Sequence, residues 1–135
     1  MSRENVEIVR AAMAAFERGD VADALAMADP QLVSTRVDPD GAVFRGHAGF
    51  RQMLAEWVEG FTDWSLRGDE FIDAGDHVVV AVHQSARGAA SGAPVEGRYW
   101  MVCSVPTGLI SGLAIYSEKE QALEAARQPP AAPQE

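Results

Sequence analysis

The sequence predicts one small α+β domain, in which helices come first and antiparallel strands follow and curl round the helices into a cone. Three observations lead to this fold class. Apolar residues recur every three or four positions before Gly60, as they do on one face of a helix. After Asp63 the apolar residues alternate with polar ones, which is the period of a strand. The turns between the later segments are short, so that consecutive strands must pair antiparallel.

The first part of the chain is expected to hold three helices. Residues 2–19 form the first, with Ser2 as its N-cap. Asp20 can cap a shorter second helix, which ends at Asp29-Pro30 because proline disfavours helical backbone in the residue before it. Residues 47–60 form the third helix, and its apolar side is large and aromatic.

The strands are expected to start with residues 31–37 and 42–44, which flank the turn sequence Asp-Pro-Asp-Gly. Ser117 is expected to cap a C-terminal helix, because Glu120 stands at the capping-box spacing. The predicted domain covers residues 1–127, and the proline-rich residues 128–135 are predicted to be a disordered tail. Between these ends lies a four-strand antiparallel meander, over residues 64–72, 78–87, 95–105 and 109–116.

Two of the predicted strands are apolar on both of their faces. Residues 78–82 and residues 99–103 carry apolar side chains at consecutive positions, so neither face of these strands suits water. The helices can cover one face of the sheet. A partner subunit would cover the other, and a homodimer through the sheet face is therefore expected.

The composition and net charge of the chain limit the kinds of molecule that it can bind. The chain has 135 residues, of which 47% are hydrophobic, enough for the core of one domain. The net charge of -9 disfavours binding to nucleic acids and to anionic membrane surfaces. The single cysteine, Cys103, excludes an intrachain disulfide, and the N-terminus lacks the apolar stretch of a signal peptide. We expect a cytoplasmic protein that binds neither nucleic acid nor membrane.

Five segments, taken in order, carry a resemblance to a known family. They are ENVEIVRAAMAAFERGD, ADPQLV, PDGAVFRGHAGFRQML, EFIDAGDHVVV and the strand end Tyr116-Ser117-Glu118. Together they resemble the NTF2-like superfamily, in particular its SnoaL-like branch, which also contains ketosteroid-isomerase-like proteins. The resemblance implies a cone-shaped α+β fold, with the N-terminal helices packed in the concave face of a strongly bent, mainly antiparallel sheet. It also implies a small-molecule pocket and, often, a dimer through the outer sheet face.

The resemblance implies as well where known chemistry of this fold would lie. The tyrosine of ketosteroid isomerases falls on Ala12, the carboxylate base on or near Thr35, and the oxyanion-binding acid on or near Trp100. None of these side chains can play the role that the reaction needs. Epoxide-hydrolase members of the fold use an acid late in the last strand, and residues 111–116 contain none. The sequence therefore has no recognisable catalytic set, and whether the protein is an enzyme stays open.

His83 and Asp38 are the remaining candidates for carrying a proton. His83 interrupts an apolar strand, although a histidine bonded within the core, an interface or the surface is the commoner case. Asp38 belongs to a turn in which carboxylates usually accept bonds from nearby backbone amides. His47 and His77 are expected at the surface, and the three histidines lack metal-ligand spacing, so neither a metal nor another cofactor is expected.

The leading functional hypothesis is a protein that binds a small hydrophobic molecule in the pocket of the cone. One alternative is an isomerase, cyclase or lyase that acts on a hydrophobic substrate. The other is a non-catalytic dimerisation or interaction module whose aromatic side chains fill the cone. The side chains expected to line the pocket are those of Phe16, Thr35, Phe50, Met53, Trp57, His83, Trp100 and Tyr116.

Overall fold

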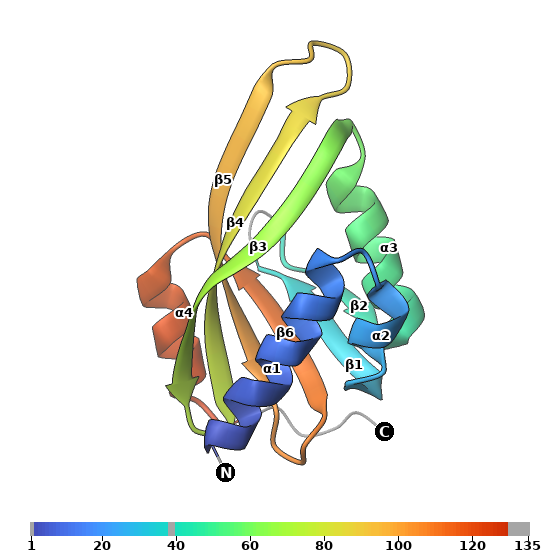
Figure 1. Ribbon diagram of the computed structural model, residues 1–135. Coiled ribbons are helices and arrows are strands. Elements are labelled where there is room, and N and C mark those ends of the chain that lie inside the picture. The colour runs from blue at the N-terminus through green and yellow to red at the C-terminus, as the bar shows by residue number, and fades with distance from the viewer. Residues whose placement is uncertain (1, 38–39, 130–135) are drawn as a thin grey trace.

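The computed structural model describes residues 2–37 and 40–129, and it contains one six-stranded sheet with helices on both of its faces (Figure 1). The strand order is β2-β1-β6-β5-β4-β3. Neighbouring strands are antiparallel except β1 and β6, which are parallel. The elements are α1 (Ser2–Glu17), α2 (Val21–Leu25), β1 (Ala28–Arg36), β2 (Ala42–Arg45), α3 (Gly46–Val58), β3 (Phe61–Ala74), β4 (His77–Gly88), β5 (Pro94–Ser104), β6 (Ile110–Tyr116) and α4 (Lys119–Ala126).

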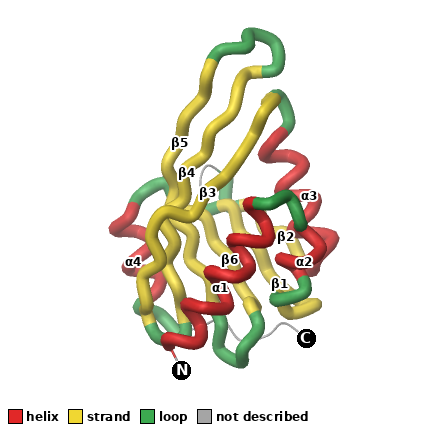
Figure 2. The backbone as a smooth tube through the Cα atoms, in the orientation of Figure 1, coloured by secondary structure: helices red, strands yellow, loops and turns green. Residues whose placement is uncertain are grey.

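The sheet is strongly bent and separates two apolar clusters. Figure 2 shows β3, β4 and β5 curving away from the body of the molecule as a long arm. The larger cluster packs α1, α2 and α3 against the inner face of the sheet. A smaller one joins Val79 and Val102 on the outer face to Ala122 and Ala126 of α4. This arrangement confirms the predicted α+β cone.

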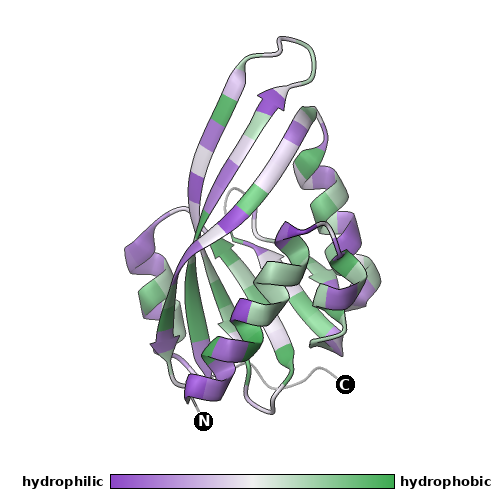
Figure 3. Ribbon diagram, viewed as in Figure 1, coloured by the Kyte–Doolittle hydropathy of each residue, from purple (hydrophilic) through white to green (hydrophobic). Residues whose placement is uncertain are grey.

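The outer face of the central strands is covered by the chain's own last helix. Val78, Val79 and Val80 have no exposed surface, which confirms that β4 is apolar on both faces. Figure 3 shows the halves of β4, β5 and β6 near α4 as hydrophobic and the arm as mixed. Because α4 supplies the second layer over β4 and β5, the two-sided strands do not require a partner subunit, and that reason for a homodimer was wrong.

The ends of several elements differ from the prediction. The Asp20 cap is confirmed, since its side chain accepts a hydrogen bond from the backbone of Asp23 at 2.9 Å. The second helix, however, ends at Leu25, and β1 begins before Pro30. Pro30 can lie within β1 because the pairing of β1 with β6 shifts register between Ala28 and Val33. At this irregularity the missing N–H of proline does not remove a regular hydrogen bond between the two strands.

The C-terminal helix is also capped differently from the prediction. Its N-cap residue is Glu118 and not Ser117, and no side-chain hydrogen bond caps it. At the other end of the molecule Ser2 is the first residue of α1 rather than its cap. Residues 130–135 of the predicted tail lie outside the described residues.

Candidate functional site: an apolar cavity

The inner face of the sheet and the three N-terminal helices enclose a cavity of about 90 Å³. Helices α1, α2 and α3 line one side of it, and β1, β3, β5 and β6 line the other. All of the described residues in its wall are apolar: Val9, Ala12, Met13, Phe16, Ala24, Leu25, Ala28, Leu32, Phe50, Met53, Leu54, Trp57, Trp64, Leu66, Met101, Cys103, Ile110, Leu113 and Ile115. The wall therefore offers a ligand contact area but almost no hydrogen-bonding groups.

The local periodicities of the sequence explain this lining. On α1 the wall residues Val9, Ala12, Met13 and Phe16 follow the three- and four-residue spacing of a single helix face. On the strands every second residue faces the cavity, as Met101 and Cys103 do on β5. An apolar wall thus follows from one helix face and one set of alternate strand positions.

Half-buried aromatic side chains lie where the cavity reaches the surface. The residues of the cavity floor are buried, whereas Phe16, Phe50, Trp57 and Trp64 are partly exposed. Their rings pack edge to face: the centroid of Phe16 is 6.3 Å from that of Phe50 and 5.9 Å from that of Trp64. Trp57 and Trp64 are 6.2 Å apart. We infer that the entrance lies between the end of α1, α3 and the start of β3.

One buried amide holds two rings of this entrance in place. Gln84, on the inner face of β4, is 2% exposed. Its Oε1 accepts hydrogen bonds from Nε1 of Trp57 at 2.6 Å and from Nε1 of Trp64 at 2.8 Å. Because both indoles only donate, the atom between them must be the amide oxygen. The polar edges of both tryptophans are thus bonded within the protein, to a residue that is not part of the cavity wall.

The thiol in the cavity wall is unreactive. Cys103 is 3% exposed and lies among apolar side chains. Burial raises the pKa of this thiol to about 12, so it is protonated at neutral pH and cannot act as a thiolate nucleophile.

The structure places four of the eight predicted lining residues on the cavity wall. Phe16, Phe50, Met53 and Trp57 line it. The four that come from strands lie elsewhere, and their assignment to the pocket was wrong. Trp100 and Tyr116 pack against the outer cluster under α4, Thr35 faces the same outer side from β1, and His83 points outward from β4. A strand shows alternate faces at successive residues, and on β5 the neighbour Met101 is the one that points inward.

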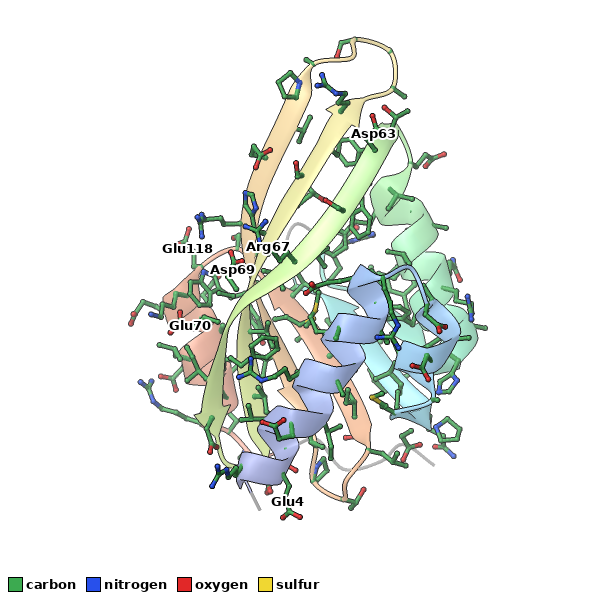
Figure 4. The ribbon with its side chains drawn as sticks, viewed as in Figure 1. Glu4, Asp63, Arg67, Asp69, Glu70 and Glu118 are labelled. Atoms are coloured by element: carbon green, nitrogen blue, oxygen red, sulfur yellow. The ribbon has the colours of Figure 1, made fainter. Side chains whose placement is uncertain are left out.

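His83 belongs to a polar network on the outer sheet face. Its Nδ1 lies 3.2 Å from Nη2 of Arg67, and its Nε2 lies 2.6 Å from Oε1 of Glu96. Since a guanidinium only donates, Nδ1 accepts and Nε2 carries the proton that is donated to Glu96. Arg67 also pairs with Asp69 at 2.7 Å, and both project from the middle of β3 (Figure 4). The sheet separates this network from the cavity.

The other acid near the predicted base position is engaged at the surface. Asp38 lies outside the described residues. Asp40 bonds to Arg36 through both of its oxygens, at 3.1 and 2.9 Å. The Arg36 guanidinium lowers the pKa of the Asp40 carboxyl below its usual value, so this carboxyl is ionised at neutral pH and paired with a cation.

His77 was predicted to lie at the surface and is instead 6% exposed, at the start of β4. It belongs to the sheet rather than to the turn, and it faces the outer side. His47 is half-buried at the start of α3, where its Nε2 lies 3.2 Å from the backbone oxygen of Ala28. Burial lowers the pKa of His77, so its imidazole is neutral at pH 7.

Residues 2–37 and 40–129 contain neither a cluster of metal-binding side chains nor a membrane-spanning helix. In that part of the chain no three histidine, cysteine or acidic side chains come together as they would to hold a metal ion. None of the helices described there is both long and apolar enough to cross a membrane.

Sequence reasoning missed most of the strand contribution to the wall. Leu66, Met101, Cys103, Leu113 and Ile115 were not predicted to line the cavity. In β3 the alternation of apolar residues could have identified Leu66, because it follows Trp64 by two residues and both side chains face the cavity. In β5 and β6 both faces are apolar, so alternation could not identify the inner one.

Comparisons with known proteins give the family and the fold. A family model described as the SnoaL-like domain matches residues 9–113. No curated protein matches the chain. An NTF2-like protein of unknown function from Burkholderia pseudomallei is 21% identical, with a TM-score of 0.74, and the match covers 90% of this chain and 95% of that one.

Two further solved structures are similar to the chain. TerC, co-crystallised with polyporic acid, is 21% identical over 93% of this chain and 99% of its own, with a TM-score of 0.73. A putative SnoaL-like polyketide cyclase from a Jannaschia species is 17% identical over 95% of this chain and 94% of its own, also with a TM-score of 0.73. At these identities the likeness establishes the fold alone.

Proposed function

The chain belongs to the SnoaL-like domain family, and from this premise we propose that it binds a small apolar molecule in the cavity between its N-terminal helices and the sheet. The observation that carries the proposal is the wall itself, in which all the described side chains are apolar. Such a wall releases water at little cost and favours ligands that need no hydrogen bonds.

The size of the cavity limits the ligand. At about 90 Å³ it is smaller than the roughly 300–1,000 Å³ of typical ligand pockets. It is of the same order as an engineered apolar cavity of about 150 Å³ that stays dry and binds benzene or xenon. We therefore expect one small aromatic or aliphatic ring to fit the cavity as it stands.

A larger ligand would need the entrance to open. Phe16, Phe50 and Trp64 are half-buried, and the ring of Phe16 packs edge to face with each of the other two, so rotation of these side chains would widen the cavity toward the surface. The solved structures similar to this chain include TerC with polyporic acid, and putative polyketide cyclases. These names support an organic molecule as the ligand of the same fold.

The binding role is favoured over the two alternatives. An isomerase, cyclase or lyase that moves a proton needs a group of suitable pKa within reach of the ligand. His83 lies on the other side of the sheet, Asp40 is paired at the surface, and the Cys103 thiol is protonated. An interaction module with a filled cone is disfavoured by the cavity that the aromatic side chains leave.

Two expectations about context accompany this proposal. We propose that the protein is cytoplasmic, and that it forms a homodimer through the part of the outer sheet face that α4 leaves uncovered. Sedimentation at micromolar concentration tests the second, and a monomer there would contradict it.

A pair of substitutions on α1 tests the binding role. Ala12 lines the cavity, whereas Ala14, on the same helix, is exposed to solvent. Benzene should raise the unfolding temperature of the unmodified protein, because a ligand that binds the folded state stabilises it. Ala12→Leu fills part of the cavity and should abolish this increase, and Ala14→Leu should retain it.

The outcomes separate clearly. An increase that survives in Ala12→Leu would place the bound benzene outside the cavity. No increase in the unmodified protein, with benzene or with the larger naphthalene, would end the binding proposal.

A further inference from the structure

Trp64 reaches from the cavity wall to a hydrogen-bond acceptor outside it. Its indole lines the cavity where the cavity meets the surface, and its Nε1 donates to Oε1 of Gln84 at 2.8 Å. Gln84 itself is not part of the wall. A planar molecule of the same size, placed where this indole lies, would therefore contact both the apolar wall and the amide oxygen.

The amide oxygen does not depend on Trp64 for its position. Gln84 is 2% exposed and belongs to β4, which has a neighbouring strand on each side. Its Oε1 also accepts a hydrogen bond at 2.6 Å from Nε1 of Trp57, which comes from helix α3. If Trp64 moves away, the acceptor stays in place and can take one new donor, because an amide oxygen has two lone pairs.

The backbone that carries Trp64 is irregular. The pairing of β3 with β4 shifts register between Thr62 and Ser65, so that Asp63 and Trp64 lie in a β-bulge, a feature that re-aims side chains. Asp63, near the start of β3 (Figure 4), has a φ of 51°, the only positive φ among the described residues that are not glycine. Since β3 is an edge strand, no second strand holds this segment from its other side.

The side chain of Trp64 is half-buried and meets its aromatic neighbours edge to face. Its ring centroid lies 5.9 Å from that of Phe16, with 88° between the ring planes, and 6.2 Å from that of Trp57, with 64° between them. Neither ring lies flat against it, so no stacked ring face has to separate when the indole turns toward solvent. Of the two tryptophans that share Gln84, Trp64 is therefore the one placed to move.

We propose that Trp64 is a gating residue, and that the ligand of the cavity is a planar aromatic molecule of two rings with one O–H or N–H donor, which takes the place of the indole. This inference rests on the binding role proposed above. The donor of the ligand bonds to the oxygen that Trp64 releases, so Gln84 again accepts two hydrogen bonds. The place of the indole adds to the cavity of about 90 Å³, so a molecule of two rings is accommodated. A ligand without a donor leaves one side of the amide oxygen unpaired.

The test uses the unmodified protein and two probes that differ by one hydroxyl group, 2-naphthol and naphthalene. Solvent exchange of the indole N–H groups, followed by NMR, reports the three tryptophans separately. At saturating 2-naphthol the N–H of Trp64 should exchange about tenfold faster or more, because it has lost its acceptor, whereas that of Trp57 should not. Trp100, on the outer face, is the internal control. Of the two probes, 2-naphthol should bind about fivefold more tightly, the effect of one hydrogen bond between neutral groups.

A pair of substitutions in β3 separates a gating residue from a wall residue. Trp64→Ala leaves the place of the indole empty, so the cost of moving it disappears and 2-naphthol should bind about tenfold more tightly. Loss of a residue that merely lines the site would weaken binding instead. Phe61→Ala removes another half-buried ring of β3, one outside the cavity lining, and should leave the affinity unchanged.

The exchange measurement needs no variant, so it decides even if Trp64→Ala does not fold. The gating role would be overturned by unchanged exchange of the Trp64 N–H at saturating 2-naphthol, by equal affinity for the two probes, or by weaker binding of 2-naphthol to a folded Trp64→Ala protein. In each of these cases saturable binding of naphthalene would still support the cavity as a ligand site. Saturable binding of neither probe would overturn both proposals.

Discussion

Gln84 has the most consequential hydrogen bonds in the candidate site. Its amide oxygen accepts hydrogen bonds from two indole N–H groups. Without Gln84, these two donors would lie in an apolar wall that offers them no acceptor. The residue could be picked from the sequence as a polar interruption of an apolar strand, at the same parity as Val80 and Val82. Its partners could not, because Trp57 and Trp64 reach it from α3 and β3 through tertiary packing.

Replacing this amide tests its role. Gln84→Leu leaves two indole donors without their acceptor, and we expect the free energy of unfolding to fall by about 1–3 kcal/mol. Gln52→Leu is the matched control, because Gln52 is exposed and its amide donates a hydrogen bond to Glu56 of the same helix at 3.2 Å. Chemical denaturation measures both. A loss no larger for Gln84→Leu than for the control would contradict the role given to Gln84.

His77 should make stability depend on pH. Burial lowers its pKa below the ordinary value of 6.5, so the unfolded chain binds the proton at a higher pH than the folded protein does. The folded protein therefore loses stability as the pH falls below about 6.5, toward the lowered pKa. The pKa of Asp40 and of Asp69 is lowered from 3.8, and their contribution is lost in a more acidic range.

The measurement is the unfolding temperature between about pH 7 and pH 5, a range that lies above those carboxyl transitions. We expect a decrease in the unmodified protein and a smaller decrease in His77→Gln, whose amide does not titrate. Equal slopes for the two proteins would mean that His77 is not the group responsible.

Helix α3 can approach β2 closely because a glycine stands at the contact. Gly49 is buried within the helix, and a Cβ there would lie 2.9 Å from the backbone carbonyl carbon of Phe44. Alanine is favoured over glycine in a helix by about 1 kcal/mol, yet this contact leaves no room for a methyl group. The close approach brings Phe50 and Met53 over the cavity.

Helix preference and the steric clash with Phe44 predict opposite changes in stability for Gly49→Ala. Because the clash is with backbone, which cannot rotate away, we expect Gly49→Ala to destabilise the protein by more than the helix preference gains. Ala55→Gly, at an exposed position of α3, should cost about 1 kcal/mol from helix preference alone. Thermal unfolding compares them. A Gly49→Ala protein more stable than the unmodified one would show that α3 can shift away from β2.

Helices and strands differed in how well the sequence predicted their faces. On α1 and α3 the apolar residues mark a single face, so Phe16, Phe50 and Met53 could be assigned to the inner side. On β5 both faces are apolar, so the choice between Trp100 and Met101 depended on which layer covers each face. The parallel pairing of β1 with β6 likewise has no local sequence signal.

The whole molecule is a bent sheet with α1, α2 and α3 on its inner face, α4 on its outer face and a different depression on each face. The order of elements in the sequence predicted the inner layer and its pocket. The outer layer was missed, because a short helix with alanines at its buried positions, Ala122 and Ala126, carries little sign of what it covers. With α4 in place, the chain itself covers part of the outer face, and the proposed homodimer is confined to the part that stays uncovered.

The methionines offer a direct measurement of binding in the inner cavity. The side chains of Met13, Met53 and Met101 line it, whereas Met27 packs against the same core outside the lining. With methionine methyl groups labelled for NMR, benzene should shift the signals of those three residues and leave that of Met27 nearly unchanged. A shift of Met27 as large as theirs, or no shift of the three, would contradict a ligand site in the apolar cavity.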